Sequence, residues 1–168
     1  PMAYRRVENR LYLHGSSGSR LMRALAENPQ VCVSITELNA LKVARSTFHS
    51  GMHYRSAVIF GEANLVPDDE KDAALDAISD SMLPGRVSEV RSSKKKELAA
   101  TLIIWLELDE TSVKISNNEV ADDEDDMGQG VWAGIVPIIT SIGTPVPADP
   151  EAAGLPVPQS VLNFRKGS

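Results

Sequence analysis

Short runs of β-branched and apolar residues, broken by loops of small or polar residues, constrain the fold of this chain more than any other feature. In residues 31–38, Val31, Val33 and Ile35 alternate with small or polar side chains, which is the period of a strand with one buried face. Asn39-Ala40 is expected to turn the chain after this strand. Further strand-like or apolar runs occupy residues 10–14, 41–46, 54–66, 101–108, 112–115 and 131–139. The sequence therefore predicts five or six strands, most of them joined by hairpin-like connections.

Two short helices are expected between the strands. The first covers about residues 19–27, where Leu21, Ala24 and Leu25 are spaced as one apolar face and Asn28-Pro29 ends the helix. The second lies between residues 67 and 84, and its apolar stripe is formed by Ala74, Leu75, Ile78 and Met82. A doubly wound sheet does not fit, because the strands do not alternate regularly with long helices. The pattern predicts an α+β, β-rich domain built as a small barrel.

The charge of the chain says little about a partner. Its 168 residues carry 17 basic and 23 acidic side chains, but residues 107–126 alone hold nine of the acids and one base, Lys114. Outside that window 16 basic and 14 acidic side chains remain, and they form no basic stripe of the kind that binds nucleic acids. No apolar run approaches the roughly 18–20 residues that a membrane-spanning helix needs, and no signal-peptide pattern is present. We expect a cytoplasmic protein that binds neither nucleic acid nor membrane.

The cysteine and the charged runs suggest no metal site. Cys32 is the single cysteine, so no intramolecular disulfide can form, and its apolar neighbours predict a buried core residue. The acidic run 122–126 lacks the spacing and the glycine of an EF-hand and is expected to be a solvated loop. Lys94–Lys96 is likewise expected to be solvated. His49 and His53 form the one tight histidine pair, and on a loop or strand edge their spacing does not predict a metal site.

The loop from His14 to Arg20 is the clearest candidate for a ligand-binding segment in the sequence. Its two glycines, one of them Gly15, let the backbone approach a ligand closely. The hydroxyls of Ser16 and Ser19 and the backbone N–H groups can donate hydrogen bonds, and Arg20 adds a positive charge. This chemistry suits a phosphate group, although the spacing of a P-loop is absent. The alternative is a plain strand-to-helix turn capped by a serine.

Two later segments also contain side chains that could act in catalysis or bind a ligand. Residues 44–56 are dense in arginines, histidines and hydroxyls for a β-rich segment, but no Ser-His-Asp order with supporting context is present. Trp132 lies beside small residues and can wall a flat ligand, whereas a core or interface tryptophan is the alternative. Trp105, inside the strand-like run 101–108, is expected in the core.

Taken in order along the chain, these pieces resemble a known family. The series is LYLHGS (11–16), SRL (19–21), VCV (31–33), ARS (44–46), YRS (54–56), FG (60–61), LPGR (83–86), KEL (96–98), SVK (112–114) and VWAGIVP (131–137). Each motif is weak alone, and the ordered series is specific. The chain resembles the pyridoxamine 5′-phosphate oxidase-related FMN-binding proteins, in the branch that includes nitroimidazole-resistance proteins, from about Leu11 to Pro158.

The resemblance implies a split β-barrel with short helices between its strands, and a homodimer that holds FMN between its subunits. Ser19 and Arg20 would bind the FMN phosphate, and His14 and Gly15 would lie beside the ribityl chain or the ring. Trp132 would reach the flavin of the other subunit. The full set of cofactor contacts that the resemblance implies is His14, Gly15, Ser16, Ser19, Arg20, Arg45, Ser46, Tyr54, Arg55, Ser56 and Trp132.

The sequence departs from the family in two places. Ser50 and His53 stand where the family often has a histidine and an asparagine, on the substrate side of the pocket. The chain begins Pro1-Met2, and the resemblance implies an upstream strand region before it. We expect residues 1–142 to form the FMN-binding domain and residues 143–168 to form a proline-rich C-terminal extension that packs on it.

The resulting functional hypothesis is an FMN-dependent oxidoreductase that acts on a small-molecule substrate or electron donor. The flavin would carry the redox chemistry, so no side chain is assigned as catalytic, although His14 or His49 could move a proton. Oxidation of pyridoxamine phosphate is not favoured, because no full site for the substrate phosphate can be assigned. Two alternatives stay open: a non-catalytic flavin carrier or redox sensor, and a split barrel that binds another cofactor such as a deazaflavin, or none.

Overall fold

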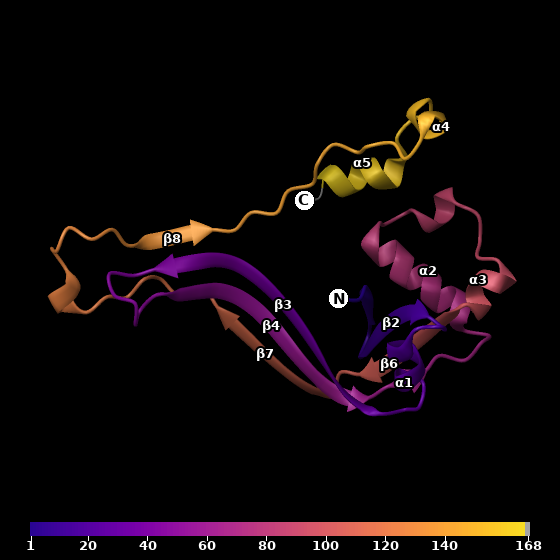
Figure 1. Ribbon diagram of the computed structural model, residues 1–168, viewed down its shortest axis with the longest axis horizontal. Coiled ribbons are helices and arrows are strands. Elements are labelled where there is room, and N and C mark those ends of the chain that lie inside the picture. Colours follow the sequence, from indigo (N-terminus) through magenta and orange to yellow (C-terminus); the bar gives the residue numbers. More distant parts are fainter. Residues whose placement is uncertain (167–168) are drawn as a thin grey trace. The chain divides into compact units, whose positions relative to one another are not determined.

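The computed structural model describes residues 1–166, which form two compact units (Figure 1). The first unit contains residues 1–31, 61–109 and 141–166, and the second contains residues 32–60 and 110–140. Each unit is built around one antiparallel sheet of four strands. Among the described residues, no helix is both long and apolar enough to cross a membrane.

The sheet of the first unit has the order β1-β2-β6-β5. Its strands are β1 (Tyr4–Val7), β2 (Arg10–Ser16), β6 (Thr101–Glu107) and β5 (Asn64–Leu65). The predicted strands at 10–14 and 101–108 are therefore confirmed, and they pair along their whole length from Arg10↔Glu107 to Ser16↔Thr101. The sequence did not predict β1, because its four residues are all exposed and do not alternate.

Helices cover both faces of this sheet. On one face, Met22 of α1 (Arg20–Leu25) packs with Ala63 and Ile104. On the other face, Ile78 of α2 (Lys71–Met82) packs with Ile103 and other residues of a second buried cluster. Because neighbouring residues of a strand point to opposite faces, Ile103 and Ile104 serve one cluster each.

Both predicted helices form, but the buried side of α1 differs from the prediction. Leu21 was expected on the apolar face and is 53% exposed, whereas Met22 is only 2% exposed. Helical spacing placed Leu21 on the apolar face, but contact with Gly15 and Ile104 selects the adjacent face that contains Met22. Asn28 ends the segment in the left-handed region, with φ of 55°.

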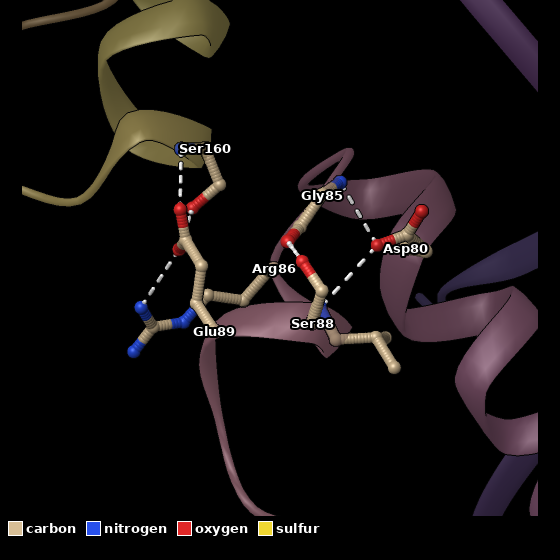
Figure 2. Close-up of polar contacts among 7 residues, drawn as sticks. Asp80, Gly85, Arg86, Ser88, Glu89 and Ser160 are labelled. Carbon is tan, nitrogen blue, oxygen red and sulfur yellow. Dashed lines mark hydrogen bonds and ion pairs between the residues drawn. The ribbon is translucent and has the colours of Figure 1, made fainter.

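The C-terminal segment adds two helices to the first unit, α4 (Pro150–Ala153) and α5 (Gln159–Lys166). Residues 143–168 were expected only as a proline-rich extension; α4 forms within it because Asp149 caps a turn that begins with Pro150. Figure 2 shows how α5 is attached: Glu89 of η1 (Val87–Glu89) accepts hydrogen bonds from the backbone N–H (2.9 Å) and the hydroxyl (2.6 Å) of Ser160. These bonds, above all the one from the hydroxyl, hold the pKa of Glu89 below its usual value.

A short helix, α3 (Lys95–Ala99), precedes β6. Glu97 receives a hydrogen bond from the backbone N–H of Lys94 and forms an ion pair with Arg91. Lys94, Lys95 and Lys96 are exposed, as predicted.

The sheet of the second unit has the order β7-β4-β3-β8. Its strands are β7 (Glu110–Ser116), β4 (Gly51–Glu62), β3 (Gln30–Val43) and β8 (Gly134–Pro137); the ends of β3 and β4 continue into the first unit. The connection between β7 and β8 contains η2 (Glu124–Asp126).

The expected turn at Asn39-Ala40 is wrong, because β3 runs straight through it. Ala40 is buried and pairs with Pro137 of β8, and the carbonyl of Asn39 accepts a hydrogen bond from the N–H of Ile138. β8 is an edge strand nearly a hundred residues away along the chain. Pairing with it satisfies the hydrogen-bonding groups of the β3 backbone while the chain stays extended.

The expected burial of Cys32 is also wrong, since its side chain is exposed. Val31 and Val33 on either side of it are partly buried, while Cys32 and Ser34 point to the open face of β3. The period-two alternation of the strand therefore outweighs the usual burial of a free cysteine.

Candidate functional site

The first group of predicted site residues lies at the junction of β2 and α1 in the first unit. His14, Gly15 and Ser16 end β2, and Ser19 caps α1, where its hydroxyl accepts a 3.5 Å hydrogen bond from the N–H of Met22. The loop is tightened by the N–H of Ser19, which donates to the carbonyl of Ser16 at 2.9 Å. Arg20 is the first residue of α1 and is exposed. The structure thus brings these residues together, and the serine-capped turn of the alternative interpretation is also present.

Gly15 allows α1 to approach β2 closely. A Cβ atom at position 15 would lie 2.7 Å from Cγ and 3.0 Å from Sδ of Met22, so any larger residue would push the methionine away. The glycine is therefore required for packing, whereas the sequence suggested a ligand contact. The sequence analysis did not single out Met22. The signal that could have found it is an apolar residue three positions after the capping serine, Ser19.

His14 carries a polar atom without a partner. Its Nδ1 is buried, and it has no hydrogen-bond partner within the described part of the chain. On β2 it lies opposite Ile103, on the sheet face that α2 covers. Buried polar atoms are nearly always hydrogen-bonded, and an exception calls for a group that supplies the missing bond.

The second group lies in the second unit and centres on an ion pair that the sequence did not predict. Asp122 accepts hydrogen bonds from the backbone N–H and from Nη1 of Arg45, both at 2.7 Å, and its side chain is 2% exposed. Burial is the largest single influence and would raise the pKa of Asp122, but the hydrogen bonds from Arg45 together hold it below its usual value. The acidic run was expected to be solvated throughout, and Asp122 corrects this. No local pattern could have shown it, because 77 positions separate the two residues.

The other histidines have partners in the same unit. Nε2 of His49 lies 3.3 Å from Asp123, and Nε2 of His53 lies 2.9 Å from the carbonyl oxygen of Asn118. The hydroxyl of Ser46 accepts a hydrogen bond from the N–H of His49 and so shapes the same loop. In the described chain no three His, Cys, Asp or Glu side chains gather as metal ligands.

Tyr54, Arg55 and Ser56 follow one another on β4, so they do not share one face of the sheet. Arg55 bonds to Glu37 of β3 at 2.7 Å. On the other face, Nζ of Lys114 lies 5.6 Å from the ring centroid of Tyr54, and a hydrogen bond with Tyr54 raises the pKa of Lys114. Ser56 pairs with Lys114 across the strands. Tyr54 and Ser56 therefore stay together, and Arg55 belongs to the opposite face.

Trp132 is 64% exposed and lies just before β8. Its ring covers Gly134: a Cβ atom there would lie 2.8 Å from the indole. The glycine leaves space for the ring, which presents a flat apolar surface beside the strand. Trp105, by contrast, packs partly against the buried cluster of Ile103, and the guanidinium of Arg10 lies 3.9 Å from its ring centroid.

The residues of the first unit fit the flavin that the resemblance implies. A flavin carries ring and ribityl groups that can bond to a histidine nitrogen, and a phosphate that an arginine and serine hydroxyls can bind. His14 has the unsatisfied nitrogen, and the turn next to it carries an exposed arginine and two serines. In the second unit, Nη1 of Arg45 is already bonded to Asp122, so its side chain fits a structural role better than a phosphate contact.

Solved structures of other proteins share the fold of this chain. One solved structure, described as the FAD and heme binding protein from Mycobacterium smegmatis, is 44% identical in sequence with a TM-score of 0.94, over 98% of this chain and 82% of that one. The flavocytochrome Anf3 from Azotobacter vinelandii is 32% identical with a TM-score of 0.89, over 98% of this chain and 77% of that one. No curated protein matches the sequence.

A third structure, of a candidate 5-nitroimidazole antibiotic resistance protein from Bacteroides thetaiotaomicron, is 21% identical. Its TM-score is 0.54, over 67% of this chain and 65% of that one, and it supports the fold alone. The family model for pyridoxamine 5′-phosphate oxidase matches residues 1–115. The predicted strand-rich split β-barrel is thereby confirmed, and the chain belongs to the pyridoxamine 5′-phosphate oxidase family.

Proposed function

We propose that this protein binds a flavin nucleotide and acts as a flavin-dependent oxidoreductase. The observation that carries the proposal is the similarity, over nearly the whole chain, to two solved proteins whose descriptions name a flavin or a flavocytochrome. The unpartnered Nδ1 of His14 supports it independently, because a bound cofactor would supply the missing hydrogen bond.

The residues at the β2–α1 turn would hold the flavin. Arg20 and the hydroxyls of Ser16 and Ser19 would bind its phosphate, and His14 would contact its ring or ribityl chain. When bound, a flavin supplies electron transfer, and the protein supplies binding, orientation and the electrostatic surroundings. The flavin contacts that the resemblance implies at Tyr54, Ser56 and Trp132 belong to the second unit and stay predictions.

Two lines of support disagree on which flavin the protein binds, FMN or FAD. The sequence resemblance implies FMN, whereas the relative that is 44% identical is described as binding FAD. Mass spectrometry of the cofactor released from the purified protein distinguishes the two. Release of FMN supports the first, release of FAD the second, and a colourless protein that takes up neither would refute the flavin site.

A flavocytochrome is the second candidate function, because the descriptions of both relatives include heme or a cytochrome. No histidine is assigned to a heme here, because Nε2 of His49 and of His53 is engaged and the unpartnered nitrogen of His14 is already proposed to contact the flavin. A Soret band in the absorption spectrum of protein supplied with heme would support this function. A spectrum with flavin bands alone would refute it.

We also propose that the protein is a homodimer. Val113 and Ile115, two residues apart on β7, share one face of the sheet and are 65% and 60% exposed. Exposed apolar side chains in a row are typical of surfaces that another chain covers. A variant with Val113→Asp and Ile115→Asp should become monomeric in sedimentation analysis. Ser112→Asp, on the opposite face of the same strand, is the matched control.

The decisive experiment for the flavin site compares two arginines of one helix. Arg20→Ala should weaken FMN or FAD binding by about tenfold or more, because a charge-assisted phosphate contact is lost. Arg23→Ala removes an equal charge one turn further along α1 and should bind as the wild type does. Equal affinities for both variants would place the phosphate elsewhere.

Turnover separates the oxidoreductase from its non-catalytic alternative. Reduction of the bound flavin by NADH or NADPH, followed by reoxidation with an added acceptor over many cycles, would support an enzyme. A flavin that binds tightly but is not reduced by either donor would favour a carrier or redox sensor. The cytoplasmic location stays a prediction.

A further inference from the structure

A pocket of about 520 Å³ lies under the C-terminal segment of the first unit, away from the β2–α1 turn. One side is formed by Leu83 and Arg86, which follow α2. The other side comes from residues 145–147 and 155–158 and from the alanines of α4. Its volume falls within the range of small-molecule sites, roughly 300–1,000 Å³.

The lining is apolar with one charged group. Among the described residues that line the pocket, Arg86 alone carries a charge, and the others are alanine, valine, leucine or proline. The prolines restrict the backbone, so this wall is stiffer than an ordinary loop. An apolar pocket with a few fixed polar groups is the usual design of a ligand site.

Arg86 is held in place while most of its donors stay available. Its Nη1 lies 3.2 Å from Glu89, and Glu89 also accepts both hydrogen bonds from Ser160 (Figure 2). The bond to Glu89 uses one of the five N–H donors of the guanidinium. A second carboxylate can therefore bind the same arginine, and a planar guanidinium binds carboxylates in a two-pronged geometry.

From the apolar lining and this single tethered cation, we infer that the pocket binds an apolar monocarboxylic acid. The carboxylate of the ligand pairs with Arg86, and its apolar body lies against the proline-rich wall. Val146 and Leu155 are exposed, so the pocket opens to solvent and a ligand can enter without unfolding of α5. This site is independent of the proposed flavin site.

Calorimetric titration of the full-length protein, with and without saturating FMN, tests the inference. Decanoate should bind saturably with one site per protein chain. Decan-1-ol, which has the same alkyl chain and no charge, should bind at least about tenfold more weakly. The affinity for decanoate should be the same in both titrations. Absence of saturable binding, or competition between decanoate and FMN, would overturn the inference.

Two substitutions locate the site. Arg86→Gln should remove the preference for the acid over the alcohol, whereas Arg91→Gln, an exposed arginine paired with Glu97 outside the pocket, should leave it unchanged. Ala153→Trp should fill the pocket and abolish binding of both compounds, and Ala99→Trp on α3 is its control. Ala153 is exposed, so folding should tolerate the larger side chain; thermal melts verify this. Wild-type affinity in Arg86→Gln or in Ala153→Trp would refute the site.

Discussion

Asp122 binds Arg45 through both of its carboxylate oxygens, one to the backbone N–H and one to the guanidinium, each at 2.7 Å. This pair ties the connection between β7 and β8 to the loop between β3 and β4. Asp122→Asn keeps the shape and removes the charge. We expect hydrogen exchange in residues 117–126 to become about tenfold faster. Asp125→Asn, an exposed member of the same acidic run, should leave exchange unchanged.

The same pair should depend on pH in a defined direction. Because the pKa of Asp122 is lower in the folded protein than in the unfolded chain, its stabilising effect is fully present above the unfolded value of about 3.9. It is lost as the pH falls through the lower, folded-state value. The difference in exchange between wild type and Asp122→Asn should therefore persist at pH 5 to 7 and shrink below about pH 3.9. A difference that is constant down to pH 2 would contradict this account.

Gly15 and Met22 should show energetic coupling. Gly15→Ala places a Cβ atom 2.7 Å from Cγ of Met22, and we expect it to lower the free energy of unfolding by about 1–3 kcal/mol. Met22→Ala alone should cost about 2–5 kcal/mol, because it opens a cavity beside Ile104. In the double variant the alanine at position 15 has space, so the combined loss should be smaller than the sum. Denaturant unfolding measures all three, with Gly18→Ala, which meets only the Ser16 hydroxyl at 3.6 Å, as control.

Gly134→Ala should displace the ring of Trp132. The new methyl group would lie 2.8 Å from the indole, which is largely exposed and can swing away, so the stability loss should stay near 1 kcal/mol or below. In a Trp105→Phe background, tryptophan emission should shift to longer wavelength and acrylamide quenching should increase. Gly143→Ala, with nothing within 4 Å of its Cβ position, should change neither signal.

Glu97 should titrate well below an ordinary glutamate. The hydrogen bond from Arg91, followed by that from the backbone N–H of Lys94, lowers the pKa of Glu97 to about 2. Its stabilising effect on the start of α3 is therefore present above the unfolded pKa of about 4.3 and is lost as the pH falls through about 2. NMR titration of the side-chain carboxyl should give a midpoint near this value, and Arg91→Ala should raise it. A midpoint near 4 in the wild type would show that the pair does not persist in solution.

Cys32 should react in the folded protein. Its side chain is exposed on β3. A thiol reagent such as dithiobis(nitrobenzoate) should therefore label one thiol per chain without denaturant. Cys32→Ser supplies the blank. Labelling only after addition of denaturant would show that another surface covers this face.

Local patterns predicted the elements whose evidence lies within a few residues. The strand-like run 101–108 and the apolar stripe of α2 can be recognised without a distant partner, and both elements formed as expected. At Asn39-Ala40 the local signal favoured a turn, but pairing with β8 keeps the chain extended. For α1, spacing gave the helix, whereas the choice between Leu21 and Met22 depended on Ile104, more than eighty residues away along the chain.

The candidate site shows the same division. His14, Gly15, Ser16, Ser19 and Arg20 could be found together because they are consecutive or nearly so. That Asp122 engages Arg45, and that Arg55 turns away from Tyr54 toward Glu37, depends on tertiary pairing that no short motif encodes. The unpartnered nitrogen of His14 is visible only once its surroundings are known.

The pairing of β2 with β6 has a consequence for synthesis of the protein. Arg10 and Glu107 are neighbours in the sheet but are separated by 97 positions in the chain. β2 leaves the ribosome well before β6, so the apolar side chains of Leu11 and Leu13 cannot be covered by β6 until that strand has been translated. Until then the nascent chain exposes an apolar strand face, of the kind that chaperones for unfolded chains bind.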